Sequence, residues 1–363
     1  MGNRPPSRNS LLAALPLAVV IFAAWLALLE IIARTPWAEK ALPDRSVGEY
    51  NYTFEIKWYG LQKFVEQSGG VDVIVLGNSM VNTGIDPEVI SRTYQRETGV
   101  HLRIYNFGVD GLTVAPTSVL AGILAAQYRP ALLVFVTDMR DYYAGNGLGT
   151  ELPFLADPWM RYRSGAFNPV GWTIDHSAAL QEFLPFRDWT RADFFGTFSH
   201  IRFRFADTRA SGYEPDHHVG QGIDLPPDPN NPADAKNFTA YQNYEIALSR
   251  LLNLESILSL NRAGKPAVLV VEMPVHPTAF AFFGGEAMHQ KFQQLIASDV
   301  KVSGGEFIPW DACSYIPLEG RSDRWHLNEK GAPIFSSCLG EQLAMGSMQQ
   351  DSILFRLGMA GGQ

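Results

Sequence analysis

Three short segments of the chain carry side chains that could act together on an acyl group. The first is Gly77-Asn78-Ser79-Met80, in which a serine directly follows an apolar run typical of a strand. The serine stands where a helix would begin, so its own N–H and the helix N-terminus could stabilise a developing oxyanion. Ser79 is therefore a candidate nucleophile and oxyanion donor; the alternative is that it only caps the helix.

The second segment lies near the C-terminus, where Asp323 and His326 stand three residues apart in DRWHLNEKG. On one loop, this spacing allows both side chains to lie beside the same edge of a sheet. His326 would take the serine proton as a general base, and Asp323 would orient the imidazole and stabilise its cation. The simpler alternative is a surface loop with an incidental histidine.

The third segment, NFGVDG at residues 106–111, follows another apolar run. Gly108 would let the backbone approach a substrate closely and could present its N–H as a second oxyanion donor. The alternative is an ordinary turn between a strand and a helix. The glycine spacing does not match G-x-G-x-x-G, which argues against a dinucleotide site.

Polar side chains also follow the remaining strand-like runs. Thr137 and Asp138 end one run, and His276 follows another. Thr137 is a candidate oxyanion donor, whereas Asn78, Asp138 and His276 are candidate substrate contacts. A structural role is the alternative for His276. An ionised Asp138 would repel an oxyanion rather than stabilise it.

The elements that must position these residues follow a regular alternation. The strand-like runs are Val71–Leu76, Leu102–Phe107, Ala131–Thr137, Ala267–Met273 and Glu306–Trp310. Helical stretches are expected at Pro87–Glu97, Ala115–Gln127, Tyr241–Asn261, Gly285–Ala297 and Ala332–Met345. The alternation predicts an α/β fold with a parallel sheet covered on both faces. Active sites in such sheets form at the carboxyl ends of the strands, where all three segments stand.

Together, GNSM, NFGVDG and DRWHLNEKG resemble the serine, glycine and Asp–His blocks of the SGNH, or GDSL-like, hydrolase family. The resemblance covers about residues 70–138 and 265–345. It implies a three-layer, flavodoxin-like α/β domain. It also implies a catalytic triad of Ser79, Asp323 and His326, with the main-chain amides of Ser79 and Gly108 as oxyanion donors.

The sequence departs from the family pattern at two points. Asn78 stands where the family usually has an aspartate before the serine. The family's third block usually offers an asparagine as an oxyanion donor, and no asparagine matches it in Val136–Met139. Loss of one donor lowers turnover by about a hundredfold or more. The departures predict slow catalysis, another donor such as Thr137, or an inactive protein.

The N-terminal region contains an uncharged run of 19 residues, Leu11–Leu29. It is long enough to cross most of a bilayer core as a helix. Arg4 and Arg8 precede it, which favours a cytoplasmic N-terminus and a folded domain outside the cytoplasm. The alternative is a cleaved signal peptide, but the apolar run is long for one and no A-x-A site directly follows it.

We expect the chain to divide into four regions. Residues 1–33 would form a cytoplasmic stub and a membrane anchor, with 11–33 in contact with the membrane. Residues 34–70 would form a stalk that includes a helix at Tyr52–Gln67. The SGNH-like domain would cover 71–350, and 351–363 would form a tail. Residues 140–236 interrupt the alternation and are too long for a plain connection, so they are expected to form a partly helical insertion on the carboxyl edge of the sheet. Five of its aromatic and basic residues could line a glycan or lipid groove: Trp189, Phe194, Phe195, Arg202 and Arg204. The alternative for the aromatic ones is that they pack in a core.

Composition excludes some partners. The net charge of -8 argues against a nucleic-acid partner, which would need a concentrated basic surface. The only cysteines, Cys313 and Cys338, are too few for a structural zinc site and would form either a disulfide or two unpaired thiols. His217 and His218 have no visible set of further ligands, so no metal and no cofactor is expected.

One N-terminal helix followed by an SGNH-like domain is similar to the envelope proteins that serve alginate O-acetylation and teichoic-acid D-alanylation. Those proteins work beside a membrane-bound O-acyltransferase. The analogy implies a membrane-anchored serine esterase or O-acyltransferase that acts on an acylated cell-envelope glycan, or a related acceptor, through an acyl-serine intermediate. The alternative is a non-catalytic SGNH-fold protein that binds a glycan or the acyltransferase.

Overall fold

The computed structural model describes residues 8–41, 45–48, 52–145, 148–184, 207–262, 266–350, 352–355 and 357. These residues form two compact units. One contains the described parts of 1–49 and 157–202, and the other contains those of 50–156 and 203–363. The larger unit holds the sheet and all the candidate site residues that are described.

The sheet has five parallel strands in the order β2-β1-β3-β4-β5. Their bounds are β1 Val73–Gly77, β2 Ile104–Gly108, β3 Leu132–Thr137, β4 Ala267–Glu272 and β5 Glu306–Ile308. Every residue of β1 to β4 is buried, as expected for central parallel strands covered on both faces. The predicted α/β fold with a parallel sheet is therefore confirmed.

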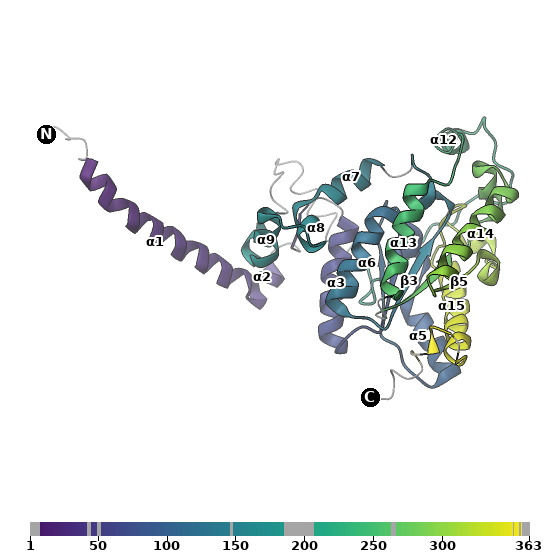
Figure 1. Cartoon of the computed structure of the whole chain (residues 1–363), viewed down its shortest axis with the longest axis horizontal. Coiled ribbons are helices and arrows are strands. Elements are labelled where there is room, and N and C mark those ends of the chain that lie inside the picture. The colour runs from purple at the N-terminus through teal and green to yellow at the C-terminus, as the bar shows by residue number, and fades with distance from the viewer. Residues whose placement is uncertain are drawn as a thin grey trace. The chain divides into compact units, whose positions relative to one another are not determined.

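Helices cover both faces of the sheet (Figure 1). On one face α6 (Val114–Tyr128) packs against α13 (Leu248–Arg262), and on the other α5 (Pro87–Thr98) packs against α15 (Gly331–Ser347). This unit also contains α7 (Leu148–Ala156), α12 (Pro232–Ala240), α14 (Glu286–Val302), and the short 3-10 helices η1 (Met139–Tyr142), η3 (Pro277–Phe283), η4 (Trp310–Cys313) and η5 (Leu318–Gly320). The helix expected from Tyr241 begins only at Leu248, because Ile246 pairs with Tyr143 in an isolated β-bridge.

A further helix and a disulfide complete the unit around the sheet. The helix expected within the stalk, α3 (Tyr52–Ser68), packs against β2 and buries Phe54 and Trp58, so it belongs to the sheet-containing unit. Cys313 and Cys338 form a disulfide that joins η4 to α15. The sequence alone left this pairing open.

The smaller unit is helical. It consists of α1 (Arg8–Ala33), α2 (Pro36–Ala41), α8 (Pro158–Arg163), α9 (Pro169–His176) and α10 (Ala178–Phe183). Within α1, Leu15–Ala33 is long and apolar enough to cross a membrane, and its most apolar stretch of 18 residues is not buried by the protein.

The segment 140–236 is not one insertion on the edge of the sheet. Its described part from 157 to 184 clusters with the N-terminal helices, whereas 207–236 belongs to the sheet-containing unit. Residues 157–184 cluster with the N-terminal helices because the carboxylate of Glu30, on α1, accepts hydrogen bonds from the first N–H groups of α10. The residues Trp189, Phe194, Phe195, Arg202 and Arg204, which we expected to line a groove or pack in a core, lie outside the described residues.

Candidate active site

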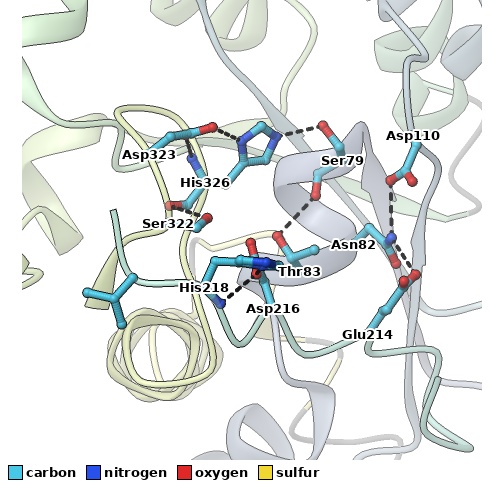
Figure 2. A pocket seen from close by; sticks show the side chains of 11 residues that line it. Ser79, Asn82, Thr83, Asp110, Glu214, Asp216, His218, Ser322, Asp323 and His326 are labelled. Carbon is cyan, nitrogen blue, oxygen red and sulfur yellow. Dashed lines mark hydrogen bonds and ion pairs between the residues drawn. The ribbon is translucent and has the colours of Figure 1, made fainter. Parts of the chain in front are cut away.

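Ser79, His326 and Asp323 form a continuous hydrogen-bonded chain (Figure 2). Ser79 Oγ lies 2.8 Å from His326 Nε2, and His326 Nδ1 lies 2.8 Å from Asp323 Oδ2. With the Nδ1 proton donated to the carboxylate, Nε2 is left as the acceptor for the serine hydroxyl. This is the geometry that lets a histidine take a proton from a serine nucleophile.

Ser79 is positioned by the junction between β1 and α4 (Ser79–Gly84). Asn78 caps α4, because its side-chain oxygen accepts the Met80 N–H at 2.9 Å. Ser79 is thus the first residue of the helix, where its N–H has no partner within the helix. Gly77 permits the tight approach of this turn to β3, since a Cβ there would lie 2.6 Å from the Val136 carbonyl oxygen.

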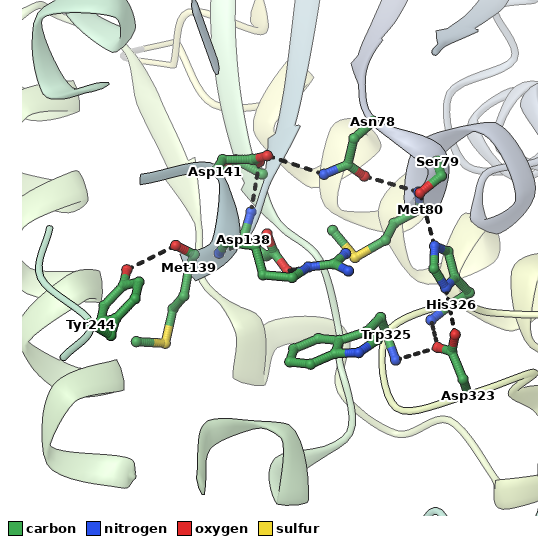
Figure 3. Close-up of polar contacts among 12 residues, drawn as sticks. Asn78, Ser79, Met80, Asp138, Met139, Asp141, Tyr244, Asp323, Trp325 and His326 are labelled. Carbon is green, nitrogen blue, oxygen red and sulfur yellow. Dashed lines mark hydrogen bonds and ion pairs between the residues drawn. The ribbon is translucent and has the colours of Figure 1, made fainter. Parts of the chain in front are cut away.

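The side chain of Asn78 also connects the serine turn to the end of β3 (Figure 3). Its Nδ2 donates to Asp141 Oδ1 at 3.1 Å, while Thr137 Oγ1 donates to the other carboxylate oxygen at 2.8 Å. Burial and the neighbouring Asp138 raise the pKa of Asp141 to about 7. An aspartate at position 78 would place a second carboxylate against Asp141, so the asparagine fits its surroundings.

The loop that carries His326 is fixed by hydrogen bonds at both ends. Asp323 Oδ1 accepts the N–H groups of Trp325 and His326 at 2.6 and 2.7 Å. Desolvation acts to raise the pKa of Asp323, but the hydrogen bond to His326 and these N–H groups outweigh it and hold the pKa at about 2. Asn328, which is 1% exposed, donates to the carbonyls of His218 and Glu319 and so ties down the following turn.

Trp325, the neighbour of His326, is packed rather than exposed. The guanidinium of Arg140 lies 4.6 Å from the centre of its ring, and the ring also contacts Phe282 and Phe283. Arg140 in turn pairs with Asp138 at 2.8 Å. The loop therefore rests on the same polar cluster that supports the serine turn.

A cavity of about 510 Å³ opens beside the triad. This volume suits a small-molecule or sugar-sized group. All of the lining residues except Val219 have polar side chains, and they come from α4, the β2–α6 turn, the 207–219 segment and the Asp323–His326 loop: Ser79, Asn82, Thr83, Asp110, Glu214, Asp216, His218, Val219, Ser322, Asp323 and His326.

Five of the predicted site residues are not among those that line this cavity. One is Asn78, whose side chain instead caps α4 and contacts Asp141. The Gly108 N–H donates to Asn106 Oδ1 at 2.8 Å, and the Thr137 hydroxyl donates to Asp141. Asp138 is 4% exposed and paired with Arg140, so its charge is balanced locally. His276 caps η3 and shares a hydrogen bond of 2.8 Å with Thr278, which matches the structural alternative. Burial and two neighbouring arginines lower the pKa of the His276 imidazole.

The cavity also contains residues that the sequence did not single out. Asn82 lies one turn after Ser79, is 1% exposed, and donates through Nδ2 to Asp110 Oδ1 at 3.1 Å and Glu214 Oε2 at 2.9 Å. Its Oδ1 has no hydrogen-bond partner among the described residues. The position of Asn82 on the helix after the serine was a usable signal, whereas nothing local marked Glu214 or Asp216.

The two adjacent histidines have carboxylate neighbours rather than a shared ligand set. His217 Nδ1 lies 2.7 Å from Glu329, and His218 Nδ1 lies 2.8 Å from Asp216. In the part of the chain that the structure describes, no group of three or more histidine, cysteine, aspartate or glutamate side chains is placed to hold a metal ion.

Comparison with known proteins gives a distant relation only. No family model matches the chain, and no curated protein matches it. Five solved chains match, among them one described as a gut microbial diltiazem-metabolizing enzyme. That match has 12% sequence identity and a TM-score of 0.36, and covers 76% of this chain and 47% of the solved one. The chain thus spans about half the length of that enzyme, and its function must be argued from its own site.

Proposed function

We propose that the chain is a serine esterase or O-acyltransferase of the SGNH type, in which Ser79, His326 and Asp323 form the triad. One observation carries the proposal. Residues separated by 247 positions in the sequence meet with Ser79 Oγ 2.8 Å from His326 Nε2. A carboxylate holds the far side of the imidazole, as nucleophilic activation requires.

The chemistry follows from these contacts. Ser79 Oγ attacks the carbonyl carbon of an ester while His326 Nε2 takes its proton. The bond between that carbon and the alcohol oxygen then breaks, and His326 returns the proton to the leaving alkoxide. Water or an acceptor hydroxyl next loses its proton to His326 and attacks the acyl-serine. The bond between the acyl carbon and Ser79 Oγ then breaks, and His326 returns the proton to Oγ. Asp323 holds the imidazole and stabilises its cation in both halves.

An oxyanion site needs N–H donors that are not already used. The N–H of Ser79 at the start of α4 is one. The Gly108 N–H is not a second, because it already donates to Asn106 Oδ1.

We further propose an acylated cell-envelope glycan, or a related acceptor, as the substrate, and a membrane-bound O-acyltransferase as the partner. Three features support this. Helix α1 is long enough to anchor the chain in a membrane. The disulfide suits a domain outside the cytoplasm. The side chains around the cavity offer hydrogen-bonding groups that suit a hydroxyl-bearing acceptor. With Arg4 and Arg8 cytoplasmic, the triad would face the envelope.

The other candidate is a non-catalytic protein of the same fold that binds a glycan or the acyltransferase. The observation that favours it is the internal use of the Gly108 N–H and the Thr137 hydroxyl, which leaves fewer oxyanion donors than the family usually has. Even a slow enzyme must have a Ser79 that can react once with an acyl group or inhibitor. A binding protein does not need a reactive serine.

Covalent labelling tests this property. The full-length protein in detergent should react with a serine-directed fluorophosphonate, and mass spectrometry should place the adduct on Ser79. Ser79→Ala and His326→Ala should each remove most of the labelling and most of the hydrolysis of a p-nitrophenyl acetate ester. The double variant should be little worse than either single one, because triad members act as a unit.

Ser256→Ala provides the matched control, because Ser256 is an exposed serine on α13 whose hydroxyl only contacts its own helix. It should label like the unchanged protein. A folded protein that takes no label at Ser79 would refute the enzyme and leave the binding function.

A further inference from the structure

The first ionisable residue after the uncharged run of α1 also holds a group of helices beside it. Glu30 Oε1 accepts the N–H of Ala178 at 2.9 Å, and Glu30 Oε2 accepts the Ser177 hydroxyl at 2.9 Å and the N–H of Ala179 at 3.1 Å. A carboxylate at a helix N-terminus is well placed to satisfy the free N–H groups there. Glu30 thus caps α10 with a side chain from α1.

Two arginines reinforce this attachment. Arg34 pairs with Glu30 at 2.6 Å and donates to the carbonyl oxygen of His176 at the end of α9. Arg45 donates to the carbonyl of Ala33 and pairs with Glu182 of α10, each at 2.8 Å. The junction between α9 and α10 is therefore fixed at the level of the last turn of α1.

The length of the apolar run gives the depth of this junction relative to a membrane. At about 1.5 Å per residue, the 19 residues of Leu11–Leu29 span about 28 Å, close to the roughly 30 Å of a bilayer hydrocarbon core. When the run crosses a membrane, Glu30 and Arg34 stand in the headgroup layer. The helices tied to them, α8 to α10, then stand in or directly above the same layer.

The segment that leads into α9, and α9 itself, expose large apolar side chains. Phe167 is 80% exposed, Val170 is 56% exposed and Trp172 is 48% exposed, and the last two lie on α9. Trp172 stacks on His176 with ring centres 4.7 Å apart, so its ring is held near the point where Arg34 is attached. Tryptophan and phenylalanine are typical of the membrane–water interface.

We propose that Phe167, Val170 and Trp172, here called the α9 patch, insert into the headgroup layer of the membrane that α1 crosses. The occupant is the lipid itself, because the polar contacts of Glu30, Arg34 and Arg45 bring the patch to that layer. The α9 patch gives the smaller unit a second membrane contact besides α1. The proposal rests on α1 being a membrane anchor and not on the chemistry of Ser79.

Site-specific fluorescence in liposomes tests the α9 patch. In the full-length protein, whose two native cysteines are bonded to each other, Phe167→Cys carries an environment-sensitive NBD dye. Its emission should be blue-shifted, quenched by phosphatidylcholine that carries a spin label near the headgroup, and several-fold less sensitive to iodide than a control dye. The control is Val302→Cys, a residue of the sheet-containing unit that is 77% exposed.

A third position separates failure of the patch from failure of the anchor. Ile21→Cys lies in the middle of α1, and its dye should be quenched by a spin label near the end of the acyl chain. If Ile21 is in lipid but Phe167 is as accessible to iodide as Val302, the α9 patch is wrong and the anchor stands. Shielding of Phe167 from both iodide and lipid labels would show that protein covers it, which also overturns the proposal. Exposure of Ile21 to water overturns patch and anchor together, and fluorophosphonate labelling of Ser79 remains an independent measure of the enzyme.

Discussion

At the scale of single residues, the orientation of one imidazole ring decides whether Ser79 is reactive. Asp323 holds that ring through Nδ1 and also accepts two main-chain N–H groups of the same loop. Its carboxylate therefore both fixes the backbone of the loop and would stabilise a positive charge on the imidazole. The low pKa of Asp323 means that it stays ionised at any pH at which His326 could act as a base.

Asp323→Asn should lower the turnover of a p-nitrophenyl ester by about a hundredfold or more, because an amide can present its NH₂ group to Nδ1 and so favour the wrong tautomer. The effect should fall on kcat rather than KM, since Asp323 acts on the base. Steady-state kinetics with unchanged far-UV circular dichroism would establish this. Activity within twofold of the original would show that the carboxylate is not needed.

A second residue-scale prediction concerns Asp141. Its pKa is raised to about 7 in the folded protein, whereas the pKa of an unfolded aspartate lies near its usual 3.8. The folded state thus binds more protons between these pH values, so stability should fall as pH rises from about 4 to about 7. One unit of pKa difference corresponds to about 1.4 kcal/mol, so the fall is on the order of a few kcal/mol.

Asp141→Asn removes this titration while keeping an oxygen for Asn78. Chemical denaturation at several pH values should therefore show a smaller loss of stability between pH 4 and pH 7 in the variant. Asp323 provides the opposite sign as an internal check, since its lowered pKa makes stability fall as pH drops from about 4 to about 2. Identical pH profiles for the variant and the original would contradict the raised pKa.

At the scale of elements, the disulfide links the two parts of the chain that flank the triad loop. Cys313 ends η4 and Cys338 lies in α15, with Asp323 and His326 between them in the sequence. The bond closes a loop across a separation of 25 residues. Closing a loop of that length limits the unfolded chain and stabilises the fold by about 3 kcal/mol.

The Cys313→Ala/Cys338→Ala variant should therefore unfold at a lower denaturant concentration, with a loss of about 3 kcal/mol. It should also lose labelling at Ser79 sooner on heating, because the triad loop lies within the closed segment. Reduction of the original protein with dithiothreitol should shift it to the same midpoint. Equal stability with and without the bond would show that α15 and η4 hold the loop by packing alone.

At the scale of the whole molecule, the orientation of α1 decides which compartment the triad faces. The positive residues Arg4 and Arg8 predict that residues 1–10 are cytoplasmic and that the sheet-containing unit is outside. A protease added to spheroplasts should therefore digest that unit, and intact cells should protect it until the outer barrier is permeabilised. Digestion in inverted vesicles but not in spheroplasts would reverse the orientation.

The strands, most of the helices and the three residues proposed as a triad were all predicted from the sequence. Apolar runs of strand length and the blocks around Ser79 and His326 are local patterns, because each depends on residues within one element or one turn. The order of those blocks then implied that Ser79, Asp323 and His326 share one sheet edge, and the structure brings them into hydrogen-bond contact.

The polar groups that are left to meet a substrate depend on contacts between distant parts of the chain. Gly108 matched a donor role by its place after a strand, yet its N–H is taken by Asn106, a side chain two residues earlier. Asn82 and Glu214 meet in the cavity across 132 positions. Residues 157–184 join α1 through Glu30 rather than the sheet. Such contacts depend on where loops close in space, and spacing along the chain does not contain that information.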